Sequence, residues 1–216
     1  MDLMQRRRQL MGMQTGGLPG TYQTVEYIEC TGTQYIVTDY VPTADETLSE
    51  FVYQYTVQRN ADDMIYGINT GSVAYYAEEY NTGRWYAALG LSRYSNIQWS
   101  GYGNNLFRTH AVIDLEKITI TNLESGVTRT ANNNQTYSSF TNTLPLYIFA
   151  WNDRGRGAGY IHHGLKIFSL KLYRAGNLSA NYIPCVRKSD NKPGMYDTVS
   201  KTFYTNAGTG EFIIPS

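Results

Sequence analysis

From Tyr22 onward, apolar and polar residues alternate in short runs that turn residues interrupt. In the run 51–57, every second residue is aromatic or aliphatic: Phe51, Tyr53, Tyr55 and Val57. Successive side chains of a strand point to opposite faces, so this spacing predicts a strand with one buried face. The runs 111–120 and 168–173 repeat the pattern, and no helical period of useful length follows residue 20. The chain is therefore predicted to be all-β.

Turn residues mark where the predicted strands are joined. Asn69-Thr70-Gly71, Asn81-Thr82-Gly83 and the segment 122–126 separate strand-like runs, as hairpin turns do. The run 144–151 is nearly continuously apolar, which predicts one central strand covered on both faces. The glycine-rich segment 154–159 is expected to be a mobile hairpin loop. These elements predict an antiparallel sandwich of two sheets.

The closing third of the chain consists of short strand-like segments, at 182–187, 194–197 and 201–206. A strand with an unpaired edge is prone to wrong pairing, so these segments need a partner in the sheet. The segments 25–30 and 34–38, near the other end, are the expected partners. The sequence thus predicts that the two ends of the domain lie side by side.

The same end segments carry a resemblance to a known family. The residues that carry it are Val25-Glu26-Tyr27-Ile28-Glu29, 31–36, Ile183-Pro184-Cys185, 187–190, 196–199 and 203–210. They resemble the concanavalin A-like (laminin-G-like) sandwich modules of structural proteins of gut bacteriophages and prophages. The resemblance spans roughly residues 18 to 212, is strong at the two ends, and implies a jelly roll. Cys30 departs from the pattern, because such modules often have Ser there.

Length and charge narrow the class of protein. The 216 residues suit one β-sandwich, at 21–216, preceded by a segment of different character at 1–20. The 18 basic and 18 acidic residues leave no net charge, so the composition gives no support for nucleic-acid binding. The sequence contains no apolar run of the roughly 18 residues that a membrane span requires.

The segment 1–20 combines arginines with leucines and methionines and ends in a glycine-rich hinge, 15–20. It lacks the apolar core of a signal peptide. Two interpretations stay open: a disordered tail, and an arm that anchors the domain to other virion proteins. The arm would use Leu3, Met4, Arg6, Arg7, Arg8, Leu10 and Met11.

Cysteines and acidic pairs give little sign of a disulfide or a metal. Cys30 and Cys185 lie in the two end segments; free buried thiols are favoured, and a disulfide is left open. Spacing that would suggest zinc is lacking. Asp45-Glu46 and Asp62-Asp63 are candidate calcium ligands, but bare loop acids are the favoured interpretation. We therefore expect no cofactor.

Candidate catalytic groups are sparse. Sugar-cleaving relatives of this sandwich use a Glu-x-Asp-x-x-Glu arrangement; here Asp114 and Glu116 are present, but Val112 takes the first Glu position. His162 and His163 are adjacent, so on a strand they point to opposite faces and do not easily share a metal. We expect no enzymatic activity.

Glycan binding is the one small-ligand activity that the sequence leaves open, and packing of the same aromatic residues is the favoured interpretation. Flat aromatic rings stack on sugar faces, while amide and carboxylate groups bond to hydroxyls. Packing in the core or at a subunit interface explains the same aromatic residues without a ligand. The candidate residues are Trp85, Tyr86, Trp99, Tyr102, Asn104, Trp151, Asn152 and Asp153.

The resemblance implies a function class. It implies a non-enzymatic bacteriophage structural protein at the virion surface: a capsid decoration, head fibre or tail appendage. Other virion proteins would be its partners through the arm, with host or mucosal glycans as further ligands and homo-oligomerisation left open. The alternative is a carbohydrate-binding lectin of bacterial or prophage origin.

Overall fold

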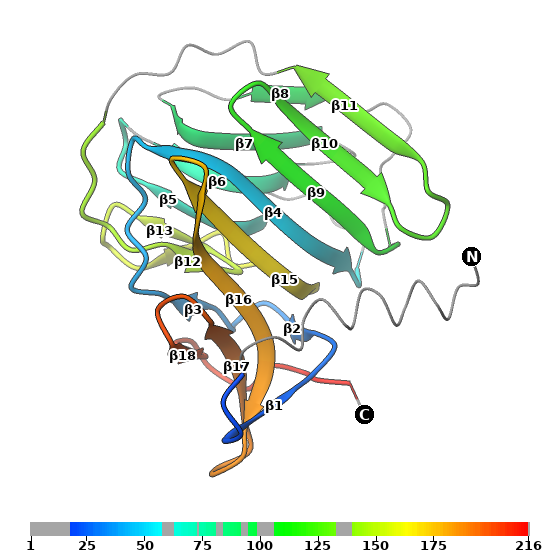
Figure 1. The fold of residues 1–216 in the computed structure, drawn as a ribbon, viewed down its shortest axis with the longest axis vertical. Helices are drawn as coiled ribbons and strands as arrows, with labels where there is room; N and C mark the ends of the chain where they lie inside the picture. Colours follow the sequence, from blue (N-terminus) through cyan, green and yellow to red (C-terminus); the bar gives the residue numbers. More distant parts are fainter. Residues whose placement is uncertain are drawn as a thin grey trace.

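The computed structural model describes residues 18–57, 63–72, 74–80, 84–91, 95–98, 106–132 and 140–215. Over these residues the chain contains strands and no helix, and two sheets pack face to face around one core (Figure 1). The predicted all-β sandwich is confirmed. The predicted arm lies, up to residue 17, outside the described residues.

Ten of the described strands form the first sheet, sheet A. They are β1 (Tyr22–Thr24), β2 (Ile28–Cys30), β4 (Glu46–Tyr55), β9 (Thr109–Asp114), β10 (Lys117–Asn122), β11 (Thr128–Asn132), β15 (Leu165–Arg174), β16 (Asn177–Arg187), β17 (Lys192–Asp197) and β18 (Thr202–Thr205). The order is β11-β10-β9-β4-β15-β16-β17-β18, with β1 beside β16 and β2 beside β15. Neighbouring strands of this sheet are antiparallel.

The other eight described strands form sheet B. They are β3 (Ile36–Val37), β5 (Asp63–Asn69), β6 (Ala74–Tyr80), β7 (Arg84–Leu91), β8 (Ser95–Gln98), β12 (Tyr147–Ile148), β13 (Trp151–Asp153) and β14 (Ala158–Gly159). The order is β14-β13-β5-β6-β7-β8, and β12 pairs with both β3 and β5. The pairing of β13 with β5 is parallel.

The two ends of the domain meet in sheet A. β15 pairs with β16 along residues 170–174 and with β2 along residues 165–167. β16 in turn pairs with β1 along residues 185–187, so β1 and β2 fill the fork where β15 and β16 separate (Figure 1). Single bridges also join Glu29 to Ile213 and Ile36 to Asn206. The predicted contact between the ends is confirmed.

The core lies between the sheets and follows the period-two pattern. Phe51, Tyr53 and Tyr55 of β4 all face it, as predicted. Val57 follows β4 and is 45% exposed, so the buried face ends earlier than its pattern indicated. Cys30 and Cys185 are free and buried, which confirms thiols rather than a disulfide; burial raises the pKa of each to about 12.

The apolar run 144–151 does not form the single strand predicted for it. Phe149, between β12 and β13, has a φ of 68° and turns the chain sharply. Its side chain enters the core, where it is fully buried and its ring centroid lies 5.2 Å from that of Phe212. In a straight strand Tyr147, Phe149 and Trp151 would share one face. The kink sends Phe149 inward, away from its two aromatic neighbours.

Candidate functional site

A row of residues crosses the outer face of sheet B. Val37, Tyr147, Gly67, Tyr76 and Ala88 are successive cross-strand partners on β3, β12, β5, β6 and β7. The residues that alternate with this row, Ile36, Ile148, Tyr66 and Tyr75, belong to the core between the sheets. The row therefore faces outward.

Trp151 of β13 also lies opposite Gly67 and joins this face. Its ring contacts Tyr76 edge-on, with centroids 6.2 Å apart, and Tyr160 likewise at 5.2 Å. Tyr76 is fully buried, Trp151 is partly exposed and Tyr160 is 50% exposed. We call Tyr76, Trp151 and Tyr160 the aromatic group. Within this group, exposure to solvent increases from Tyr76 through Trp151 to Tyr160.

Gly67 leaves room at the base of the aromatic group. A Cβ atom there would lie 2.6 Å from Cβ of Tyr76 and 3.3 Å from Cβ of Trp151. Contacts below 3.0 Å require a shift of the neighbouring groups, so a larger residue would displace the rings. Glycine at this position therefore sets how closely Tyr76 and Trp151 approach one another.

A second pair of rings lies on the same face. Tyr35 and Tyr147 stack with centroids 5.6 Å apart and an interplanar angle of 23°, and both are partly exposed. Burial and the neighbouring Tyr35 raise the pKa of the Tyr147 hydroxyl. The sequence analysis missed this pair. The period-two spacing of Tyr35 and Val37, with Ile36 buried between them, is a signal that could have found Tyr35.

The glycine-rich segment forms the predicted hairpin, because β13 and β14 pair around it. The backbone nitrogen of Arg154 donates to the Asn69 carbonyl at 2.8 Å, which fixes the hairpin to the end of β5. Asp153 is partly exposed and shares the outer face with Trp151, two residues before it. The predicted mobility of this loop stays a prediction.

Asn152 points away from the aromatic group and is 1% exposed. Its Nδ2 donates to the Pro145 carbonyl at 3.1 Å, and its Oδ1 accepts from the Gly155 nitrogen at 3.0 Å. The amide thus holds the hairpin in place, and we leave Asn152 out of the site. Alternation along β13 explains why Trp151 and Asn152 cannot both face a ligand.

The other predicted glycan-binding residues divide between two places. Tyr86 of β7 is partly buried and packs with Met64, Tyr76 and Ala88 on the outer face of sheet B. The backbone of Trp85 lies on β7, paired with Glu79 and Ile97. Trp99, Tyr102 and Asn104 lie outside the described residues.

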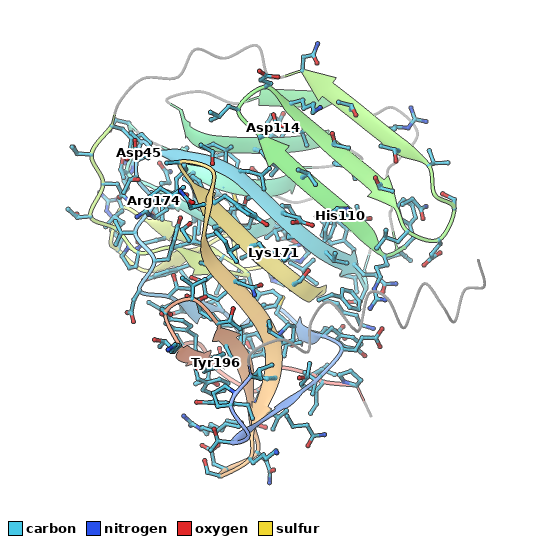
Figure 2. The ribbon with its side chains drawn as sticks, viewed as in Figure 1. Asp45, His110, Asp114, Lys171, Arg174 and Tyr196 are labelled. Atoms are coloured by element: carbon cyan, nitrogen blue, oxygen red, sulfur yellow. The ribbon has the colours of Figure 1, made fainter. Side chains whose placement is uncertain are left out.

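The outer face of sheet A carries charged groups instead (Figure 2). Glu50, in β4, is 3.1 Å from Nε2 of His110 and 3.4 Å from Nζ of Lys171, on the strands to either side. The hydrogen bond from His110, together with Lys171, outweighs burial and lowers the pKa of Glu50 to about 2. Tyr173 OH also donates to Glu50, at 3.5 Å. The carboxylate is thereby held ionised among its own partners.

Two of the acidic candidates for catalysis and calcium, Asp114 and Glu46, serve as structural groups. Oδ1 of Asp114 accepts from the backbone nitrogens of Glu116 and Lys117, at 2.7 Å each, and so shapes the β9–β10 turn. Glu46 is buried, and its carboxylate bonds to Arg174 at 2.8 Å and to Tyr40 OH at 2.6 Å. Asp45 is exposed beside it.

The two adjacent histidines point in opposite directions, as predicted. His162 is 3% exposed and stacks on Tyr55, with ring centroids 4.9 Å apart. His163 is exposed, and its Nδ1 lies 3.5 Å from Oδ1 of the buried Asp63. Asp62 is outside the described part of the chain. Among the described residues, no three His, Cys, Asp or Glu side chains gather as metal ligands would.

A search of the described residues for a long apolar helix that could cross a membrane found none. No protein-family model matches the chain, and no curated protein sequence matches it.

Three solved structures align with the chain. The Ruminococcus gnavus IT-sialidase CBM40, a carbohydrate-binding module, aligns with a TM-score of 0.51 and 11% identity, over 70% of this chain and 91% of that one. Scytalido-glutamic peptidase has a TM-score of 0.38 and 12% identity, over 76% and 90%. SCP-B, of the Eqolisin family of peptidases, has a TM-score of 0.34 and 14% identity, over 76% and 89%.

The first of these alignments supports the fold, and the comparisons correct one expectation. At 11% identity, the likeness to the carbohydrate-binding module shows a shared β-sandwich and nothing finer. The sequence analysis expected no enzymatic activity, but two of these three solved structures are peptidases. We withdraw that expectation. The peptidase TM-scores, 0.38 and 0.34, assign no activity to this chain.

Proposed function

We propose that this chain is a carbohydrate-binding module and that the aromatic group on the outer face of sheet B is its site. The observation that carries the proposal is the pairing of Trp151 with Tyr160, two rings in contact, one partly and one 50% exposed. Aromatic side chains combine a large apolar surface with a polar edge, which suits the mixed surface of a sugar.

The rings are held by rigid elements, which favours binding without reorganisation. Trp151 lies in β13, paired with β5 on one side and β14 on the other. Tyr76 buttresses it from β6, and the kink at Phe149 separates it from the core. A preformed site loses less conformational entropy when it binds a ligand. Asp153, on the same face, supplies a hydrogen-bond acceptor for hydroxyl groups.

Packing against a second protein chain would use the same rings, because interfaces also favour Tyr and Trp. The sheet A face is a weaker candidate for a ligand site, because Glu50 is already bonded to His110, Lys171 and Tyr173. The proposal therefore commits to sheet B and to a sugar, with a protein interface as the outcome that would replace it.

The test is a glycan array followed by calorimetric titration of the best ligand. Tyr160→Ala should weaken binding about tenfold without unfolding the domain, and Trp151→Ala should abolish measurable binding. Lys171→Ala, on the opposite face, is the matched control and should bind like the unchanged protein. Circular dichroism confirms that each variant is folded.

Two results would overturn the proposal. One is an array on which no glycan binds the folded protein. The other is a dimer in sedimentation velocity that Tyr160→Ala dissociates, because the face would then be an interface between copies.

The virion role rests on the sequence resemblance alone, and the arm on which it depends lies outside the described residues. A virion surface protein that adheres to host or mucosal glycans would use such a site. The predicted placement and the proposed binding are therefore compatible, and each needs its own experiment.

A further inference from the structure

We infer that the site extends beyond the aromatic group to the stacked pair of Tyr35 and Tyr147, and that its ligand is a linear oligosaccharide of several sugar units rather than a single terminal sugar. This inference rests on the proposed function.

The two ring pairs lie on one continuous face. Tyr147 and Trp151 are both partnered with Gly67 of β5, the first through an antiparallel and the second through a parallel pairing. The chain reversal at Phe149 is what brings two residues four positions apart to the same strand. Gly67 has no side chain to separate them, so nothing at this position of β5 rises between the pairs.

The face is longer than one sugar ring. The row from Val37 on β3 to Gly67 on β5, opposite which Trp151 lies, crosses two strand spacings, about 10 Å. Tyr35 continues the aromatic surface at the β3 end, and Tyr160 at the β14 end. Val37 is 37% exposed beside Tyr147, which adds apolar area where the site would otherwise end. A single sugar on Trp151 and Tyr160 would leave this second area unused.

Within each pair, the two rings hold one another in place by direct contact. Tyr35 and Tyr147 stack at 5.6 Å, and Trp151 and Tyr160 meet edge-on at 5.2 Å. Each pair thus presents a composite surface fixed by its partner ring and by the strand beneath it. Two such surfaces on one sheet face suit a ligand that repeats the same unit.

The experiment measures affinity against chain length, using cello-, xylo-, malto- and chito-oligosaccharides of one to six units. In the series that binds, affinity should rise with length until both ring pairs are covered. Tyr147→Ala should lower the affinity for the longest oligosaccharide about tenfold. It should leave the affinity for the shortest oligosaccharide that binds unchanged. Tyr147→Phe, which keeps the ring, should retain long-chain affinity and controls for folding.

The outcomes separate the two proposals. If the array and all four series give no binding, the proposed function fails, and this inference fails with it. If a sugar binds through Trp151 but affinity does not depend on length, or Tyr147→Ala and Tyr35→Ala weaken short and long ligands equally, only the extended site is overturned.

Discussion

The outer faces of the two sheets differ in how their side chains are satisfied. On sheet A, acidic groups bond to basic groups of neighbouring strands, as Glu50 does with His110 and Lys171. On sheet B, aromatic rings contact one another and keep part of their surface exposed, as Trp151 and Tyr160 do. On the first face the polar groups hold neighbouring strands together, and on the second part of the aromatic surface, at Trp151 and Tyr160, stays exposed.

The difference has a physical origin. An ion pair is satisfied once its two charges meet, and a further partner must compete with a bond already made. A ring in edge-on contact with another ring still offers its own face, because dispersion and hydrophobic contact do not saturate with one neighbour. The comparison teaches that loss of a charge on sheet A should damage stability, while loss of an exposed ring on sheet B should damage binding.

The largest expected effect comes from Phe149, which links the core to the aromatic face. Phe149→Ala removes a fully buried ring and its contact with Phe212, so the free energy of unfolding should fall by about 4 kcal/mol. Urea titration measures it, and sugar affinity should fall as well because Trp151 loses its support. Tyr160→Ala is the contrasting variant, with a change in stability below about 0.5 kcal/mol. A loss of binding without a loss of stability in Phe149→Ala would contradict this account.

A somewhat smaller effect is expected at Arg174. Arg174→Ala leaves the buried Glu46 carboxylate without its guanidinium partner, which should lower stability by about 3 kcal/mol. Arg187→Ala is the matched control, because its pair with Asp190 is exposed to solvent and should contribute little to stability. Thermal unfolding of both variants measures the stability that each substitution removes. Equal losses of stability would show that the burial of Glu46 does not strengthen its pair with Arg174. Sugar binding should be unchanged in both.

The smallest of the three effects is a pH dependence at Glu50. Its pKa of about 2 in the folded state is below the ordinary value of 4.5, so it adds stability above pH 4.5 and loses that contribution as the pH falls toward 2. With its partial exposure allowed for, the contribution is about 2 kcal/mol. Glu50→Gln should be less stable than the unchanged protein at pH 7, and the gap should close between pH 4.5 and 2. If the difference in unfolding free energy between the two proteins stays constant from pH 4.5 to 2, this account of Glu50 is wrong.

Sequence patterns predicted the fold more completely than they predicted the site. The alternation at Phe51, Tyr53 and Tyr55 places a strand face correctly because burial imposes it locally. The contact between the two ends follows from the need to pair every strand, even though Gln34 and Glu211 bond across 177 positions. The polar sheet A pairs, such as Glu50 with Lys171, depend on register and leave no local pattern.

The site depended on one backbone angle. An apolar run does not reveal that Phe149 adopts a φ of 68°, because phenylalanine rarely does so and the angle is imposed by packing. With the run read as one strand covered on both faces, Tyr147 lay in its middle, whereas Trp151 stood at its end, next to a predicted loop. Asn152 was expected among the glycan-binding residues, whereas its bonds to Pro145 and Gly155 hold it buried behind β13.

The insertion of β1 and β2 into the fork between β15 and β16 has a consequence for synthesis. β1 and β2 can acquire these hydrogen-bonded neighbours only after the segments that follow β14 have been made, since Thr24 pairs with Cys185 and Glu29 with Ile213. This part of sheet A is therefore expected to assemble late and slowly, because its pairings join residues far apart in the sequence. Nascent chains that stall early would display bare β edges, and would be the forms that chaperones need to shield.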